Sequence, residues 1–231
     1  AGFAALRLVL GFVEQNPETT GALFHHVLAA IHARLSRVAI TYPVPNRASL
    51  TQSMEAIRRY LSERTGGVRL QAVSAGLFQS LGRCTGLWRE VATARINTAD
   101  AANSRVADLS CTDEAGHTAL AVEVKDRQLT LRDVQDKLPG VRRDAIRELL
   151  FLVQGGVRKA EDEAVKVLAD KEFTTGQNVY VCEFTGFLEV CLIVLGEDGR
   201  RDLLLEIGQA LDDMAADYPH RDAWRQMLQA L

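Results

Sequence analysis

The chain lacks the features of a membrane-bound or disulfide-stabilised protein. None of its apolar runs approaches the roughly 20 residues needed to cross a bilayer, and the most apolar stretch, residues 187–196, is short and includes Glu189. The four cysteines lie far apart, without Cys-x-x-Cys spacing or a histidine at zinc-finger spacing. We therefore expect a protein of the reducing cytoplasm with no membrane partner, no disulfide framework and no structural zinc.

A strong excess of positive charge is also missing. The formal net charge is -3 and the sequence pI is about 6.0, which argues against a protein that passively coats nucleic acid. Of the 27 cationic residues only five are Lys, and the rest are Arg, which suits bidentate contacts to phosphate and guanine. No P-loop and no G-x-G-x-x-G motif occurs, so we expect no nucleotide cofactor.

Hydrophobic periodicity divides the chain into two parts. Helical patterns dominate up to about residue 64, where Thr65-Gly66-Gly67 ends the last of them. We predict a helical N-terminal subdomain over 1–64 and a core with a helical C-terminal tail over 65–231.

The second part alternates between strand and helix patterns. Strands are predicted at 87–96, 104–112, 117–126, 148–153 and 178–184, with helices at 68–82, 129–138 and 161–173. Pro139-Gly140 is expected to interrupt the helix that begins near 129, which then resumes at 141. A meander followed by crossovers predicts an α/β fold with a mixed central β-sheet flanked by helices.

One group of charged residues stands out in this pattern. Glu123 and Lys125 lie two residues apart near the end of a predicted strand, and therefore on the same face of it. Asp108 lies on the preceding strand, across a predicted hairpin turn at 113–116, and can come opposite that face. Two carboxylates can hold Mg²⁺, a bound metal activates water, and a lysine balances charge, as phosphodiester hydrolysis requires.

The acid-x-Lys spacing alone is weak support. Composition predicts roughly 0.65 such triplets in a chain with these numbers of acids and lysines. The alternative is that Glu123 and Lys125 form the solvated face of an ordinary edge strand. The placement at the end of a predicted strand, with an Asp at hairpin distance, favours the catalytic interpretation.

A longer resemblance extends this interpretation. The segments LQAVSAGLFQSLG, RINTADAANSRVADLS, AVEVKDRQLTLRDVQDKL and EIGQALDDMAADYPHRDAWRQMLQAL resemble the SacI family of restriction endonucleases over roughly 68–231. The resemblance implies a PD-(D/E)xK nuclease fold and Mg²⁺-dependent cleavage of double-stranded DNA in a prokaryotic cell, with Mn²⁺ as a substitute metal. Asp108 then corresponds to the first metal-binding acid, Glu123 to the second and Lys125 to the motif lysine. Ala107 replaces the proline of the motif.

Further residues are candidates for metal or DNA contacts. Glu90 could supply a third acid, although a solvated Glu is the commoner explanation. DNA-binding candidates in the loop before Asp108 are Asn97, Asp100, Asn103 and Arg105, and those after Lys125 are Arg127, Arg132 and Gln135. The first set could equally be turn residues that bond their own backbone. The start of the following helix could also favour phosphate.

Three functions remain open from the sequence. The leading hypothesis is a site-specific type II restriction endonuclease of a restriction-modification system, acting as a homodimer so that two centres cut both strands. The second is a low-specificity effector nuclease of another anti-phage defence system. The third is a catalytically inert DNA-binding or scaffold subunit.

Overall fold

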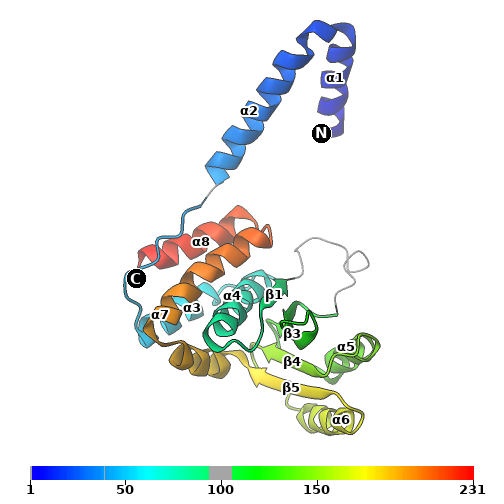
Figure 1. Cartoon of the computed structure of the whole chain (residues 1–231), viewed down its shortest axis with the longest axis vertical. Coiled ribbons are helices and arrows are strands. Elements are labelled where there is room, and N and C mark those ends of the chain that lie inside the picture. The colour runs from blue at the N-terminus through cyan, green and yellow to red at the C-terminus, as the bar shows by residue number, and fades with distance from the viewer. Residues whose placement is uncertain (1, 39, 94–105) are drawn as a thin grey trace. The chain divides into compact units, whose positions relative to one another are not determined.

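The computed structural model describes residues 2–38, 40–93 and 106–231, which form two compact units, Ala1–Thr41 and Tyr42–Leu231. The first unit consists of α1 (Gly2–Gln15), a single 3-10 turn η1 (Pro17–Thr19) and α2 (Thr20–Val38) (Figure 1). Large apolar side chains of this unit are exposed, among them Phe3, Leu8 and Phe24. No helix in the described part of the chain is long and apolar enough to cross a membrane.

The second unit contains a five-stranded sheet and six helices among the described residues. Its elements are α3 (Leu50–Tyr60), α4 (Val68–Thr85), β1 (Glu90–Thr93), β2 (Leu109–Thr112), β3 (Thr118–Lys125), α5 (Leu131–Arg143), β4 (Glu148–Val153), α6 (Asp162–Thr174), β5 (Asn178–Glu183), α7 (Phe184–Asp213) and α8 (Tyr218–Gln229). The predicted mixed α/β sheet flanked by helices is confirmed.

The strands follow one another across the sheet in chain order. β1 pairs antiparallel with β2 and β2 with β3, whereas β3, β4 and β5 run parallel. The predicted hairpin is present, and its register sets Leu109 opposite Val122. Helical crossovers supply the parallel connections, as parallel pairing requires. The carboxyl ends of β3 and β4 therefore lie together at one end of the sheet.

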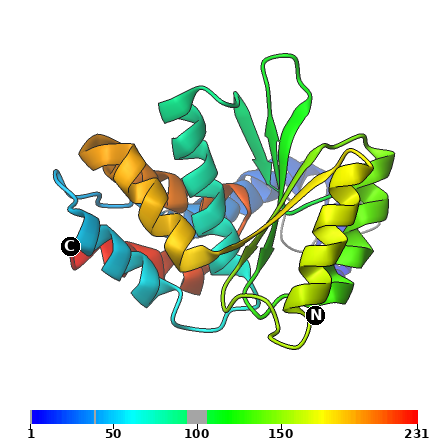
Figure 2. The ribbon, with the colours of Figure 1, turned by 90° about the horizontal axis from the view of Figure 1, so that it is seen from below.

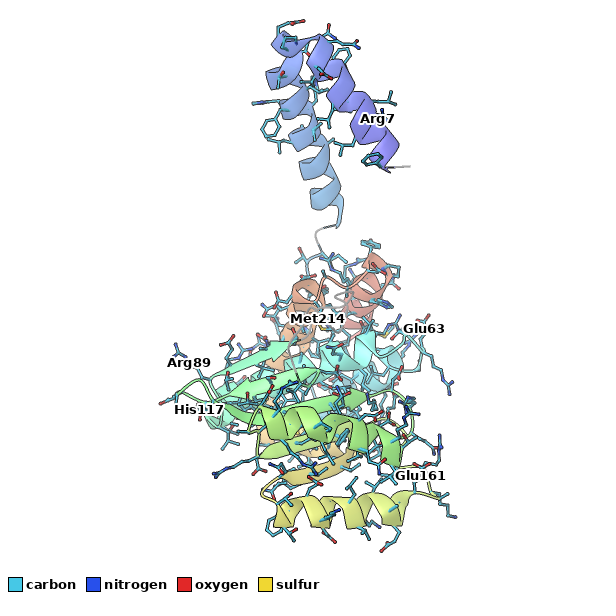
Figure 3. The ribbon with its side chains drawn as sticks, turned by 90° about the vertical axis from the view of Figure 1, so that its right-hand side faces the viewer. Arg7, Glu63, Arg89, His117, Glu161 and Met214 are labelled. Carbon is cyan, nitrogen blue, oxygen red and sulfur yellow. The ribbon has the colours of Figure 1, made fainter. Side chains whose placement is uncertain are left out.

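Helices cover both faces of the sheet. α5 and α6 lie on one face, and α4 and α7 on the other (Figure 2). Figure 3 shows Glu161, beside α6, and Met214, after α7, on opposite sides of the strands. The side of the sheet that faces α5 and α6 contributes Ala121, Phe151 and Val153 to a buried cluster completed by Val134, Leu138 and Val141 of α5.

α3 belongs to the second unit, whereas the sequence led us to expect it in a subdomain over 1–64. Ser49 and Gln52 form a capping box that begins this helix, and Ile57 and Tyr60 on its inner face are fully buried. The hydroxyl of Tyr60 donates to the carbonyl of His220 in α8, and its ring lies 5.0 Å from that of Trp224. Amphipathic periodicity marks a helix but not the surface on which it packs.

The prediction that Pro139-Gly140 interrupts the helix is wrong. α5 runs continuously through Pro139 and ends at Arg143. A proline removes one backbone donor and disturbs the preceding turn. Here the buried residues Leu138 and Val141 on either side hold the helix against the sheet.

Candidate active site

Asp108 lies immediately before β2, at the point where the strand enters the sheet. Its Oδ2 accepts a hydrogen bond of 2.9 Å from the backbone N–H of Val124 on β3. Burial raises the pKa of the Asp108 carboxyl, and the negative charge of Glu123 raises it further. The carboxylate is thus fixed at the end of the β2–β3 hairpin and faces a second acid.

Glu123 and Lys125 share one face of β3, as the period of two predicts. Glu123 is almost fully buried, with 2% of its surface exposed. The Nζ of Lys125 donates to Glu123 Oε1 at 2.6 Å. Because Glu123 pairs with Phe151 and Lys125 with Val153 in the neighbouring strand, both side chains point toward the α5 side of the sheet. This buried geometry differs from the solvated face of an edge strand.

A second lysine completes the cluster and was missed in the sequence. Lys137 of α5 places Nζ 2.8 Å from Glu123 Oε2 and 3.4 Å from the carbonyl oxygen of Val106, to which it donates a hydrogen bond. No spacing rule links positions 123 and 137. The signal that could have found Lys137 is its place beside Val134 and Leu138, on the helix face expected to cover the sheet.

The donor set fits a divalent cation held by few protein ligands. Within the described residues, Asp108 and Glu123 are the only carboxylates brought together here, and no cluster of three metal-ligating side chains forms. Although Lys137 is close, its alignment is not that of a hydrogen bond, so Glu123 Oε2 is a buried oxygen without a hydrogen-bond donor in this part of the chain. Mg²⁺ commonly uses one or two carboxylates and keeps several waters.

Glu90 lies away from this cluster. It is exposed at the start of β1, where it pairs with Thr112 at the opposite end of β2 from Asp108. It lines a separate cavity of about 510 Å³ together with Arg83 and Glu206. Figure 3 shows its neighbour Arg89 beside His117, at the end of the sheet opposite Glu63. The structure therefore does not bring Glu90 to the two carboxylates.

The DNA-binding candidates after Lys125 lie in the loop that follows β3 and on α5. Arg127 forms two hydrogen bonds with the carboxylate of Asp133, at 2.7 and 2.8 Å. Arg132 and Gln135 are exposed on α5. The N-terminus of α5 is already occupied, because Glu161 Oε2 accepts from the N–H of Leu131 at 2.6 Å and Thr130 forms a capping box with Asp133. An acid at this end removes the basis for expecting phosphate there.

Asn97, Asp100, Asn103 and Arg105 lie outside the described residues.

The class that this fold and cluster define is that of α/β nucleases. Residues 47–156 match the family model described as the SacI restriction endonuclease C-terminal domain. This part of the chain is a domain of the SacI restriction endonuclease family, and Asp108, Glu123, Lys125 and Lys137 all lie within it. The match begins before the region of predicted resemblance and does not extend into the C-terminal helices. No curated protein matches the chain.

Proposed function

We propose that the protein is a Mg²⁺-dependent type II endodeoxyribonuclease of the PD-(D/E)xK kind that cuts double-stranded DNA at a specific site. The observation that carries the proposal is the convergence of Asp108, Glu123 and Lys125 at one end of a mixed sheet, inside the restriction endonuclease domain. A restriction endonuclease domain implies DNA as the substrate. Products with 5′-phosphate and 3′-hydroxyl ends are expected.

Each residue has a role that follows from its contacts. Asp108 and Glu123 would hold Mg²⁺, which when bound polarises the scissile phosphate and lowers the pKa of a water molecule. The N–H of Val124 holds the Asp108 carboxylate in place through Oδ2. Lys125 supplies a positive charge beside Glu123, where it can neutralise charge that develops on the phosphate.

A homodimer would suit this activity. Cutting both strands of a symmetric site needs two centres related by a two-fold axis, and two identical chains supply them. Mass measurement of the protein by light scattering, with and without DNA, tests this part separately from cleavage.

Plasmid cleavage tests the catalytic assignment. Asp108→Asn should abolish Mg²⁺-dependent cutting because it removes a charged metal ligand, and Lys125→Ala should reduce cutting by roughly 100-fold or more because it removes a positioned positive charge. Circular dichroism should show both variants folded. Glu90→Gln is the matched control and should cut at the rate of the parent protein.

The pattern of products separates the functions left open by the sequence. Discrete bands support site-specific cleavage, and end sequencing then identifies the site. A smear would instead identify a low-specificity effector nuclease. An absence of cutting at every Mg²⁺ and Mn²⁺ concentration would identify an inert subunit, and unchanged cutting by Asp108→Asn would rule out the site.

A further inference from the structure

The candidate centre contains equal numbers of acidic and basic side chains. Within the described residues, Glu123 contacts Lys125 through Oε1 and Lys137 through Oε2, and Asp108 faces the same group. Two carboxylates and two ammonium groups leave no net charge when all four are ionised. A divalent cation would add two positive charges to a centre that is already neutral.

Lys137 can move away from Glu123 more readily than Lys125 can. The Lys137 side chain is 31% exposed, compared with 21% for Lys125, so its ammonium borders solvent. Its contact with Oε2 lacks hydrogen-bond alignment, whereas Lys125 donates a hydrogen bond to Oε1. Of the two lysines, Lys137 is therefore the one whose bond to Glu123 is weaker and whose charge faces outward.

The backbone around Lys137 brings its helix unusually close to the segment that carries Asp108. A Cβ added to Gly140, one turn further along α5, would lie 3.2 Å from a methyl group of Val106. The Nζ of Lys137 also reaches the carbonyl of Val106. Close packing therefore holds Lys137 beside Glu123 and beside the segment that leads into Asp108, with its side chain partly open to solvent.

We propose that Lys137 couples metal binding to DNA binding, an inference that rests on the proposed nuclease function. In the protein without DNA, its ammonium pairs with Glu123 and opposes the entry of a cation. When DNA binds, a backbone phosphate offers the ammonium another anion, and Glu123 Oε2 becomes free to ligate the metal. Metal and DNA then strengthen each other's binding, because coupling between two sites is reciprocal.

The test compares Mn²⁺ binding without DNA and Mn²⁺-dependent cleavage of plasmid. Without DNA, Lys137→Met should bind Mn²⁺ about three- to tenfold more tightly than the parent protein, because a competing positive charge has been removed. Free Mn²⁺ is measured by electron paramagnetic resonance. The Mn²⁺ concentration for half-maximal cleavage should fall less than the dissociation constant does, and the maximal cleavage rate should drop.

Two further variants provide the controls. Lys137→Arg keeps the positive charge and should return the Mn²⁺ affinity toward that of the parent protein. Lys166→Met removes a lysine that pairs with Asp162 on α6, and it should change neither measurement. Thermal unfolding of each variant reports whether the fold has been preserved.

The outcomes separate this inference from the proposed function. If the parent protein cuts DNA but Lys137→Met binds Mn²⁺ no more tightly without DNA, the coupling role is overturned and the nuclease assignment stands. Weaker Mn²⁺ binding together with a lower melting temperature would show a structural role and also overturn the inference. A parent protein that neither binds Mn²⁺ nor cuts DNA would overturn both.

Discussion

Asp133 connects the end of β3 to the start of α5. Its carboxylate accepts hydrogen bonds from Arg127, from the N–H of Thr130 and from the hydroxyl of Thr130. The hydrogen bonds from Arg127 hold the pKa of Asp133 well below its usual range, and those from Thr130 lower it further. A single side chain thus fixes both the loop that follows Lys125 and the helix that carries Lys137.

Asp133→Asn should lower the free energy of unfolding at neutral pH by about 1 kcal/mol, the usual value of a helix cap. A depressed pKa stabilises the fold above the unfolded pKa of about 4, and this contribution is lost as the pH falls below that value. In urea unfolding, the difference in the free energy of unfolding between the parent protein and Asp133→Asn should therefore shrink from pH 7 toward pH 3. Asp136→Asn, which breaks an exposed 3.5 Å pair with Arg132, is the control. A difference that does not change with pH would contradict the explanation.

The sequence predicted part of the candidate centre. Asp108, Glu123 and Lys125 could be placed together because a hairpin and a period of two follow from local pattern, and the strand register confirms that hairpin. Lys137 could not be assigned to this centre from the sequence, because its approach to Glu123 depends on how α5 packs across the sheet. Local sequence pattern could not predict the position of Glu90 either, because that position depends on the register between β1 and β2.

At the scale of elements, β4 was predicted with the bounds that the structure shows, because a continuous apolar run is typical of a strand covered on both faces. The predicted break of the helix at Pro139 is wrong, and the reason is the packing of α5. Propensity opposes the helix at this position, but buried neighbours in the same turn outweigh it. Element type was therefore easier to predict than element end.

The crossing of α4 and α7 offers a test at this scale. A Cβ at Gly76 would lie 2.9 Å from the backbone nitrogen of Ile207, and backbone cannot move aside as a side chain can. Gly76→Ala should lower the free energy of unfolding by about 1–3 kcal/mol through overpacking. Gly186→Ala on α7, where no atom lies within 4 Å, should be close to neutral. Denaturant unfolding of both variants makes the comparison, and equal stabilities would show that the helices can separate without cost.

At the scale of the whole molecule, the compact units divide between Thr41 and Tyr42, whereas sequence patterns favoured a boundary at 64/65. Both Pro-containing and Gly-rich segments are typical of linkers, and the sequence has one at each place. The buried contacts of α3 show that this helix packs with the second unit, so that the two units divide before α3 and not after it. Its Tyr60 is fully buried against α8.

Truncated proteins test the boundary. A protein of residues 42–231 should unfold cooperatively, because it keeps every element of the second unit. A protein of residues 65–231 should lose cooperative unfolding and bind a hydrophobic dye, because it leaves Trp224 and its neighbours uncovered. Calorimetry and dye fluorescence distinguish the two. Identical melting curves would favour the boundary at 64/65.

The bond between the Tyr60 hydroxyl and the carbonyl of His220 spans 160 positions of sequence. During translation, α3 leaves the ribosome long before α8 has been made, so the inner face of α3 stays uncovered until α8 emerges. The segments that carry Asp108, Glu123 and Lys125 emerge within that interval. The helical packing around α3 is thus completed only after α8 has been synthesised.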